Sequence, residues 1–188
     1  CDQYPYTATS TSMTALLPHW AHDGGVPALL QRLKEPTQRL KEETGVEMEN
    51  RGGPASILVS GTHGYHPEWE GKTVEQLSQE FQMDPVDTVI RVLEQCGSSV
   101  ACIYFCINEE DMLRIMSDMD ICVGSDGYNF SYDRSITRTD PHPRSFGTFP
   151  RFLRLVREHK LMPLEDAVHK ITGLPAQILG LADRGILR

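Results

Sequence analysis

Charged and aromatic side chains occur at three places where a strand is expected to end and a loop to begin. They lie in Asp2-x-Tyr4-Pro5-Tyr6, in Thr62-His63-Gly64-Tyr65-His66 and in Gly124-Ser125-Asp126-Gly127. In parallel α/β folds, ligands bind at the carboxyl ends of the strands, so each of these segments is a candidate binding or catalytic site.

The segment around Asp126 is the most informative of the three. Asp126 comes just after an apolar run that ends at Val123, and it stands between glycines, which let the backbone approach another group closely. Two interpretations stay open from these residues alone. Ser-Asp-Gly is typical of a surface turn, whereas a carboxylate at the end of a buried strand can bind a metal ion or transfer a proton.

The histidines give weaker signals. His63 and His66 are three residues apart, which suits a metal pair on a helix, but the glycine and proline beside them favour a loop. His142 and Arg144 lie in a segment stiffened by two prolines, which suits contacts to a substrate and equally suits an anchor for the loop. No GxSxG, GxGxxG, phosphate-loop or His-Glu-x-x-His motif is present, so serine-triad, dinucleotide and zinc-protease chemistry have no support.

Strands and helices are expected to alternate along the chain, which predicts a parallel sheet and an α/β fold. The segment 2–7 is expected to be the end of a strand, and further strands are expected at 55–60, 100–106 and 121–123. Helices are expected at 26–33, 36–44, 108–117, 149–159, 164–171 and 175–179. Two more helices begin with capping signals, one with the Thr73 and Gln76 pattern of a capping box and one with Asp84 before a proline. Loops are expected at 9–14 and 128–147.

Composition and charge exclude several classes of protein. With 188 residues, 39% of them hydrophobic, the chain is long enough for one ordinary domain and too short for two comfortable ones. No apolar stretch approaches the roughly 20 residues of a membrane span, so no membrane partner is expected. The net charge of −8 repels phosphate backbones, which argues against nucleic acid. The 5 cysteines lie mostly in apolar runs, which indicates buried thiols and a cytoplasmic location.

Several sequence blocks resemble the N-acyl-D-amino-acid deacylases, the D-aminoacylases of the amidohydrolase superfamily. The matching blocks, in the same order as in that family, are 2–8 (DQYPYTA), 17–25 (LPHWAHDGG), 71–73 (GKT), 124–127 (GSDG), 142–151 (HPRSFGTFPR) and 170–176 (KITGLPA). The resemblance runs from Asp2 to Leu187, and the Gly-Thr-Phe-Pro-Arg and Ser-Asp-Gly blocks together make it specific.

The resemblance implies a zinc-dependent (β/α)8 barrel that hydrolyses the amide of an N-acylated D-amino acid. It implies that Asp126 binds or lies beside the metal and accepts the proton of the attacking water. His142 and Arg144 match the loop after the last barrel strand, where a guanidinium could pair with a substrate carboxylate. Tyr4 is expected to contact the substrate as well.

The same resemblance places most of the family's metal ligands, including its His-x-His pair, before Cys1. We therefore expect 1–188 to be a single domain holding barrel strands six to eight, with an inserted helical segment at about 35–70. The parent protein is then the enzyme, and the isolated chain is expected to be inactive and able to self-associate through exposed sheet edges.

Two other functions remain open from the sequence. Dihydroorotase- or hydantoinase-like enzymes use the same barrel and the same strand-eight aspartate on cyclic amides, and a substrate panel separates them from deacylases. A degenerate or truncated chain could instead serve as a folded scaffold or binding module without catalysis. The presence of a His-x-His motif upstream in the parent reading frame would argue against that second alternative.

Overall fold

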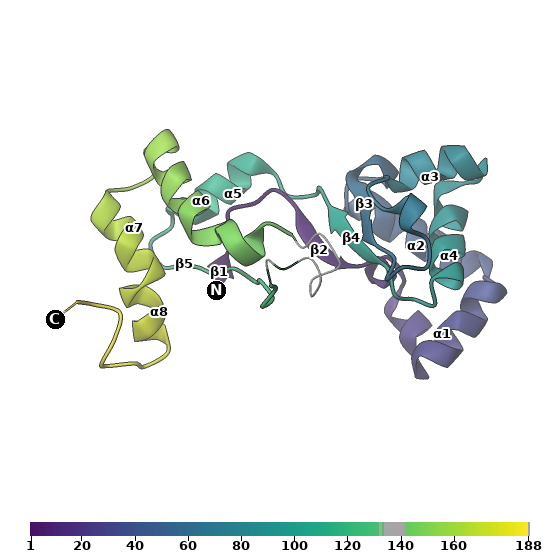
Figure 1. The fold of residues 1–188 in the computed structure, drawn as a ribbon, viewed down its shortest axis with the longest axis horizontal. Helices are drawn as coiled ribbons and strands as arrows, with labels where there is room; N and C mark the ends of the chain where they lie inside the picture. The colour runs from purple at the N-terminus through teal and green to yellow at the C-terminus, as the bar shows by residue number, and fades with distance from the viewer. Residues whose placement is uncertain (132, 134–141, 188) are drawn as a thin grey trace. The chain divides into compact units, whose positions relative to one another are not determined.

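The computed structural model describes residues 1–131, 133 and 142–187. Its contacts divide the chain into two compact units, each described here by itself (Figure 1). Unit 1 contains the described residues of 1–7, 107–133 and 142–187, and unit 2 contains 8–106. All four residues assigned to the site from the sequence, Tyr4, Asp126, His142 and Arg144, belong to unit 1.

Unit 2 is built on a three-stranded sheet with the strand order β2-β4-β3. The strands are β2 (Thr9–Ser12), β3 (Ile57–Gly61) and β4 (Ala101–Tyr104), and both pairings are antiparallel. The prediction of a parallel sheet is therefore wrong for this unit. The loop expected at 9–14 is also wrong in part, because β2 pairs with β4 along its whole length and the Tyr104 hydroxyl donates to the Ser12 carbonyl at 2.9 Å.

Helices pack against the sheet of unit 2. The α-helices are α1 (Gly25–Lys34), α2 (Gln38–Asn50), α3 (Val74–Phe81) and α4 (Pro85–Gln95). Short 3-10 helices are η1 (Met13–Leu16), η2 (His19–His22), η3 (Pro54–Ser56) and η4 (Pro67–Trp69). Both capping signals are confirmed: the Thr73 hydroxyl accepts from the Gln76 N–H at 3.2 Å, and the Asp84 carboxylate accepts from the Val86 N–H at 2.8 Å.

Helix α2 is longer than the helix expected at 36–44 and has a buried face. It continues to Asn50 and buries Leu40, Thr44 and Met48, which are spaced four residues apart and share one face. Two apolar residues on one face are enough to dock a helix whose remaining positions are polar.

The described residues of unit 1 contain one pair of short parallel strands, β1 (Asp2–Gln3) and β5 (Cys122–Val123), in the register Asp2 to Cys122. Its helices are α5 (Glu109–Ser117), α6 (Arg144–His159), α7 (Leu164–Ile171) and α8 (Gly173–Ile178). The core residues of this unit are Met112, Met116, Val123, Phe152, Leu155, Val156 and Ala167. Parallel pairing is what the alternation of elements predicts here, while the assignment to barrel strands six to eight and to a single domain stays a prediction.

Helix α6 begins five residues earlier than predicted, at Arg144, and Gly147 and Pro150 lie inside it. These two residues read as helix breakers in the sequence, and the structure shows what Gly147 is needed for: a Cβ atom there would lie 2.8 Å from the Tyr6 hydroxyl oxygen. The predicted loop at 128–147 therefore ends before α6, and most of its middle falls outside the described residues. No helix in the described part of the chain is long and apolar enough to cross a membrane.

Candidate functional site

Asp126 lies three residues after β5 and presents its carboxylate to solvent, with 70% of the side chain exposed. Its backbone φ of 45° is in the left-handed region, which few residues other than glycine adopt and which aspartate tolerates better than most. The segment 124–127 is an irregular loop that directs a carboxylate outward from the end of a strand.

The glycines near Asp126 lie close to other parts of unit 1, and at Gly127 the neighbouring atoms are backbone. A Cβ atom on Gly124 would lie 2.8 Å from Cγ of Asp2, and one on Gly127 would lie 2.7 Å from Cα of Ser145. The groups that approach these glycines are the protein's own strand β1 and helix α6. The glycines thus hold the Asp126 loop between these two elements.

Arg144, the first residue of α6, makes the main contact to Asp126. Its Nη2 lies 3.0 Å from Asp126 Oδ2, and the guanidinium carbon lies 5.0 Å from the centroid of the Tyr4 ring. Only 6% of the Arg144 side chain is exposed, whereas its carboxylate partner is open to solvent. Three of the four residues assigned from the sequence are thus in one cluster.

The fourth residue, His142, precedes Arg144 by two residues and lies in the same cluster. It is buried, and its Nδ1 accepts the backbone N–H of Arg144 at 3.1 Å, so a neutral ring carries its proton on Nε2. Its ring lies 6.2 Å from that of Tyr4 and packs edge-on against Tyr6 at 5.1 Å. In this structure His142 acts as an anchor for the start of α6, and its contact with a substrate stays a prediction.

Tyr6 and Arg151 were given no role of their own from the sequence, although Tyr6 lies in one of its candidate segments. Arg151 stacks on the Tyr6 ring at 4.9 Å and donates from Nε to the Pro5 carbonyl. Burial raises the pKa of Tyr6, and the charge of Arg151 partly opposes this. The signals in the sequence were the Tyr-Pro-Tyr block, which contains Tyr6, and the Phe-Pro-Arg block, which contains Arg151. Together they could have indicated the contact between these two residues.

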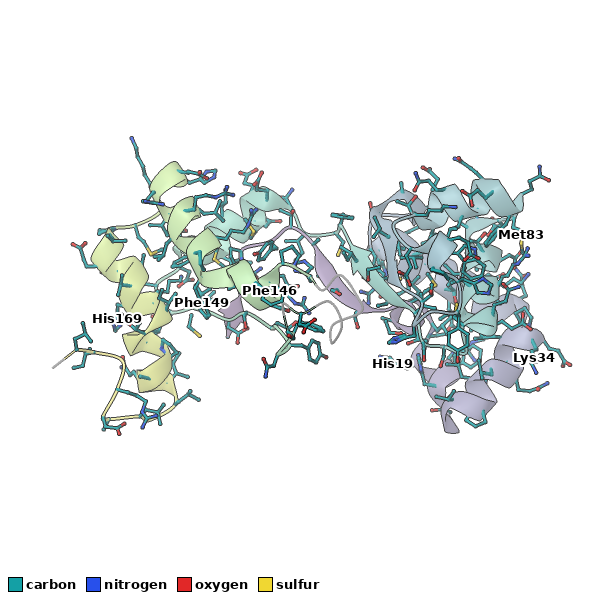
Figure 2. The ribbon with its side chains drawn as sticks, viewed as in Figure 1. His19, Lys34, Met83, Phe146, Phe149 and His169 are labelled. Carbon is teal, nitrogen blue, oxygen red and sulfur yellow. The ribbon has the colours of Figure 1, made fainter. Side chains whose placement is uncertain are left out.

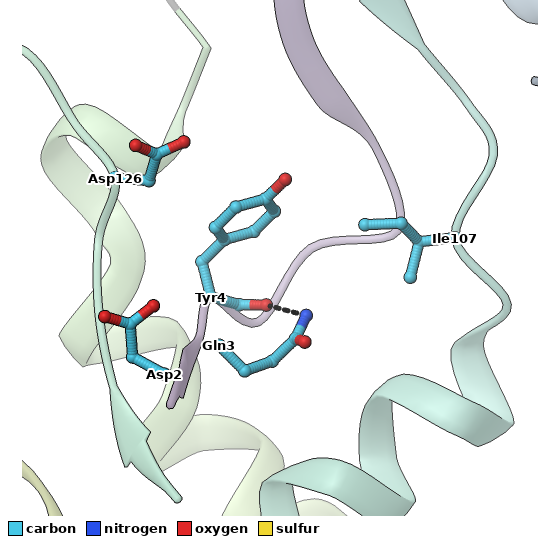
Figure 3. Close-up of a pocket in the computed structure, with 5 residues that line it drawn as sticks. All are labelled: Asp2, Gln3, Tyr4, Ile107 and Asp126. Carbon is cyan, nitrogen blue, oxygen red and sulfur yellow. Dashed lines mark hydrogen bonds between the residues drawn. The ribbon is translucent and has the colours of Figure 1, made fainter.

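A cavity of about 290 Å³ opens beside the cluster. Asp2, Gln3, Tyr4, Ile107 and Asp126 line it. In the view of Figure 3, Asp2 and Asp126 lie on one side of the Tyr4 ring and Ile107 on the other, and Gln3 Nε2 donates to the Tyr4 carbonyl at 3.0 Å. Two carboxylates, an amide and an aromatic ring give this cavity a negative and mostly polar wall, of a size that suits a small polar molecule.

A metal centre needs more ligands than this cluster supplies. A catalytic zinc ion takes three protein ligands, and the residues described in the structure contain no group of three His, Cys, Asp or Glu side chains placed to hold one. The described residues therefore do not form a zinc site by themselves, and metal binding by Asp126 stays a prediction.

The other two candidates, His63 and His66, lie in a loop of unit 2, as the flanking glycine and proline indicate. His66 Nδ1 is 2.9 Å from Glu68 Oε1, and its ring stacks on Trp69 with the centroids 3.8 Å apart. The hydrogen bond from His66 lowers the pKa of Glu68. These contacts give His66 a local structural role.

No family model matches the chain, but solved structures do. The N-acyl-D-glutamate deacylase of Bordetella bronchiseptica, solved with zinc and a phosphonate mimic of the tetrahedral intermediate, matches all of this chain and 30% of its own, with a TM-score of 0.65 and 28% identity. A D-aminoacylase structure, solved in work on the functional role of its binuclear metal centre, is also similar. The match covers 98% of this chain and 29% of the D-aminoacylase chain, with a TM-score of 0.65 and 30% sequence identity. D-aminoacylase defines a subset of the amidohydrolases, and this class is the one that the chain resembles in structure.

Curated proteins that are similar in sequence are all named as deacylases or D-aminoacylases. The N-acyl-D-aspartate deacylase of Alcaligenes xylosoxydans xylosoxydans is 38% identical over 132 residues, which are 70% of this chain and 24% of the relative. The D-aminoacylase of the same organism is 39% identical over 123 residues, 65% of this chain and 23% of the relative. The resemblance to the N-acyl-D-amino-acid deacylases is thereby confirmed. The chain spans about a quarter of the length of the curated relatives it matches.

Proposed function

We propose that the whole protein to which this chain belongs hydrolyses the amide bond of N-acyl-D-amino acids. The observation that carries the proposal is the solvent-facing Asp126 carboxylate held 3.0 Å from a buried guanidinium at the end of a parallel strand. It occurs in a chain 38–41% identical to enzymes named for acyl-D-aspartate, acyl-D-glutamate and D-amino acids. We extend that substrate class to this protein.

In this proposal Asp126 is the general base. It accepts a proton from the attacking water as the new C–O bond forms, and it returns the proton to the nitrogen as the C–N bond breaks. The products are a carboxylate and the free D-amino acid. The exposure of Asp126 and its place in the cavity wall support this role, because water and substrate can both reach the carboxylate.

Arg144 is proposed to bind the substrate carboxylate, with Tyr4 and His142 fixing its position. A planar guanidinium recognises a carboxylate through paired N–H donors. Its burial, its stacking on Tyr4 and the His142 bond to its backbone N–H leave it little freedom to move. A site fixed in this way can select one orientation of the α-carboxylate, which is what discrimination between enantiomers requires.

Zinc is the proposed cofactor, because the Bordetella bronchiseptica deacylase was solved with zinc. A bound zinc ion lowers the pKa of its water from 15.7 to about 7 and so makes hydroxide available at neutral pH. Asp126 is the residue of this chain proposed to lie beside the metal. Its other ligands would come from outside the described residues.

The test is hydrolysis of N-acetyl-D- and N-acetyl-L-aspartate, glutamate and leucine by the intact protein with added zinc. We expect D-selective turnover that Asp126→Asn lowers by about 100-fold or more. Asp120→Asn removes another exposed carboxylate of unit 1 and should leave turnover unchanged.

Other outcomes separate the competing functions. Turnover that survives Asp126→Asn would assign the general base to another residue and leave Asp126 as part of a loop. Hydrolysis of dihydroorotate or hydantoins alone would favour the cyclic-amide enzymes of the superfamily. No hydrolysis of any of these amides would favour a folded scaffold without catalysis.

A further inference from the structure

The ion pair between Arg144 and Asp126 joins a buried cation to an exposed anion. Arg144 is 6% exposed, it stacks on Tyr4, and its backbone is held at both ends: the N–H by His142 Nδ1 at 3.1 Å and the carbonyl by the Thr148 hydroxyl at 2.8 Å. Asp126 is 70% exposed and lies in a loop outside the core of unit 1. If the contact breaks, the carboxylate is the group that moves.

The same contact fixes the orientation of the carboxylate that the proposed reaction needs. Oδ2 of Asp126 accepts from the guanidinium, so one oxygen of the carboxylate is held toward Arg144 and the carboxylate cannot turn freely toward a water molecule in the cavity. An ion pair with one partner so exposed adds little stability, because water competes for the carboxylate. A second carboxylate that reaches Arg144 can therefore replace Asp126 at small cost.

We propose that the substrate carboxylate replaces Asp126 on Arg144 and thereby frees Asp126 to act as the base. This inference rests on the proposed function and adds a requirement to it: the protein hydrolyses acyl amides that carry a free carboxylate beside the scissile bond. Neutral analogues bind without breaking the Arg144–Asp126 contact and leave the base engaged. Arg144 is then a positioning residue for Asp126 as well as the anchor for substrate.

The test compares an N-acetyl-D-amino acid with its carboxamide, in the intact zinc-loaded protein and in its Arg144→Gln and Arg144→Lys variants. We expect Arg144→Gln to lower kcat/KM for the carboxylate substrate by about 100-fold, the effect of one lost charged contact. The same substitution should raise kcat for the carboxamide severalfold, because Asp126 is then free in every molecule. Arg144→Lys keeps the charge and should keep the preference for the carboxylate.

An unchanged or lower kcat of Arg144→Gln on the carboxamide would overturn the proposal and leave Arg144 with substrate binding or loop support alone. A wild-type protein that hydrolyses neither substrate would instead contradict the proposed function itself. The two failures are thus distinguishable.

A second measurement uses only the wild-type protein, so it does not depend on the folding of a variant. Formate added to the wild-type protein should occupy Arg144 and speed the initial hydrolysis of the carboxamide severalfold, while slowing that of the carboxylate substrate by competition. Formate that inhibits both substrates, or affects neither, would contradict the exchange of carboxylates on Arg144.

Discussion

The backbone of Gly127 touches that of Ser145, since a Cβ atom on Gly127 would lie 2.7 Å from the Ser145 Cα. Ser145 follows Arg144 in α6, and Gly127 follows Asp126 in the loop. The contact between the two backbones therefore sets the separation of the two charged side chains beside them. A larger residue at position 127 must push the loop away from the helix.

Gly127→Ala tests this relationship. We expect a loss of about 1–3 kcal/mol in the free energy of unfolding, since overpacking against backbone cannot be relieved by a side-chain rotation. We also expect a fall in kcat/KM, because the Asp126 carboxylate moves relative to Arg144. Urea unfolding followed by circular dichroism, together with the deacylase assay, measures both effects.

The matched control is Gly45→Ala in α2. A Cβ atom there would meet Val86 Cγ2 at 3.5 Å, an ordinary contact, and Gly45 lies inside a regular helix. Alanine is the better helix former, so stability should rise by about 0.5–1 kcal/mol. A Gly127→Ala protein as stable and as active as Gly45→Ala would contradict the packing argument.

Two phenylalanines of α6 give a second prediction. Phe152 is fully buried in the core of unit 1, whereas Phe149, labelled in Figure 2, is 43% exposed. Phe152→Ala should lower the free energy of unfolding by about 3–5 kcal/mol, because it leaves a cavity as well as removing apolar contacts. Circular dichroism is the suitable probe, since both tryptophans lie in unit 2.

Phe149→Ala is the comparison for that experiment. It removes the same side chain from the same helix at a half-exposed position, so its cost should be clearly smaller. Equal losses for the two variants would show that the packing assigned to α6 is incorrect.

Local signals in the sequence predicted the elements that local interactions stabilise. The Thr73 and Gln76 capping box and the Asp84 cap each join residues at most three apart, and both were found where the sequence placed them. Strand β2 could not be predicted in this way. Its Ser/Thr run becomes a strand because Thr9 pairs with Tyr104, a residue far along the chain.

The candidate site shows the same division. The sequence indicated Asp126 and Arg144 separately, from a strand end and from a resemblance, but their pairing depends on how α6 packs beside the β5 loop. The start of α6 at Arg144 could not be predicted either, because Gly147 and Pro150 disfavour a helix in the local sequence. The contact of Gly147 with Tyr6 is tertiary, so no local signal reveals it.

The pH dependence of unit 2 gives the last prediction. Burial raises the pKa of the Cys102 thiol from 9.0 to about 12, and burial also raises that of its neighbour Tyr104. The folded protein therefore keeps both protons at pH values where the unfolded chain loses them. By linkage, this contribution to stability is complete below about pH 9 and is lost as pH rises toward 12.

Urea unfolding between pH 7.5 and 10.5 measures this loss, with the fluorescence of Trp20 and Trp69 as the signal because both lie in unit 2. Between pH 9 and 10.5 we expect Cys102 alone to cost on the order of 2 kcal/mol. Cys102→Ala removes the titrating thiol, so its stability should fall less steeply with pH even though it is less stable at neutral pH. Cys106→Ala removes an exposed thiol and should follow the wild-type slope. The same slope in all three proteins would mean that the Cys102 thiol ionises as readily in the folded chain as in the unfolded one, which its complete burial beside Tyr104 argues against.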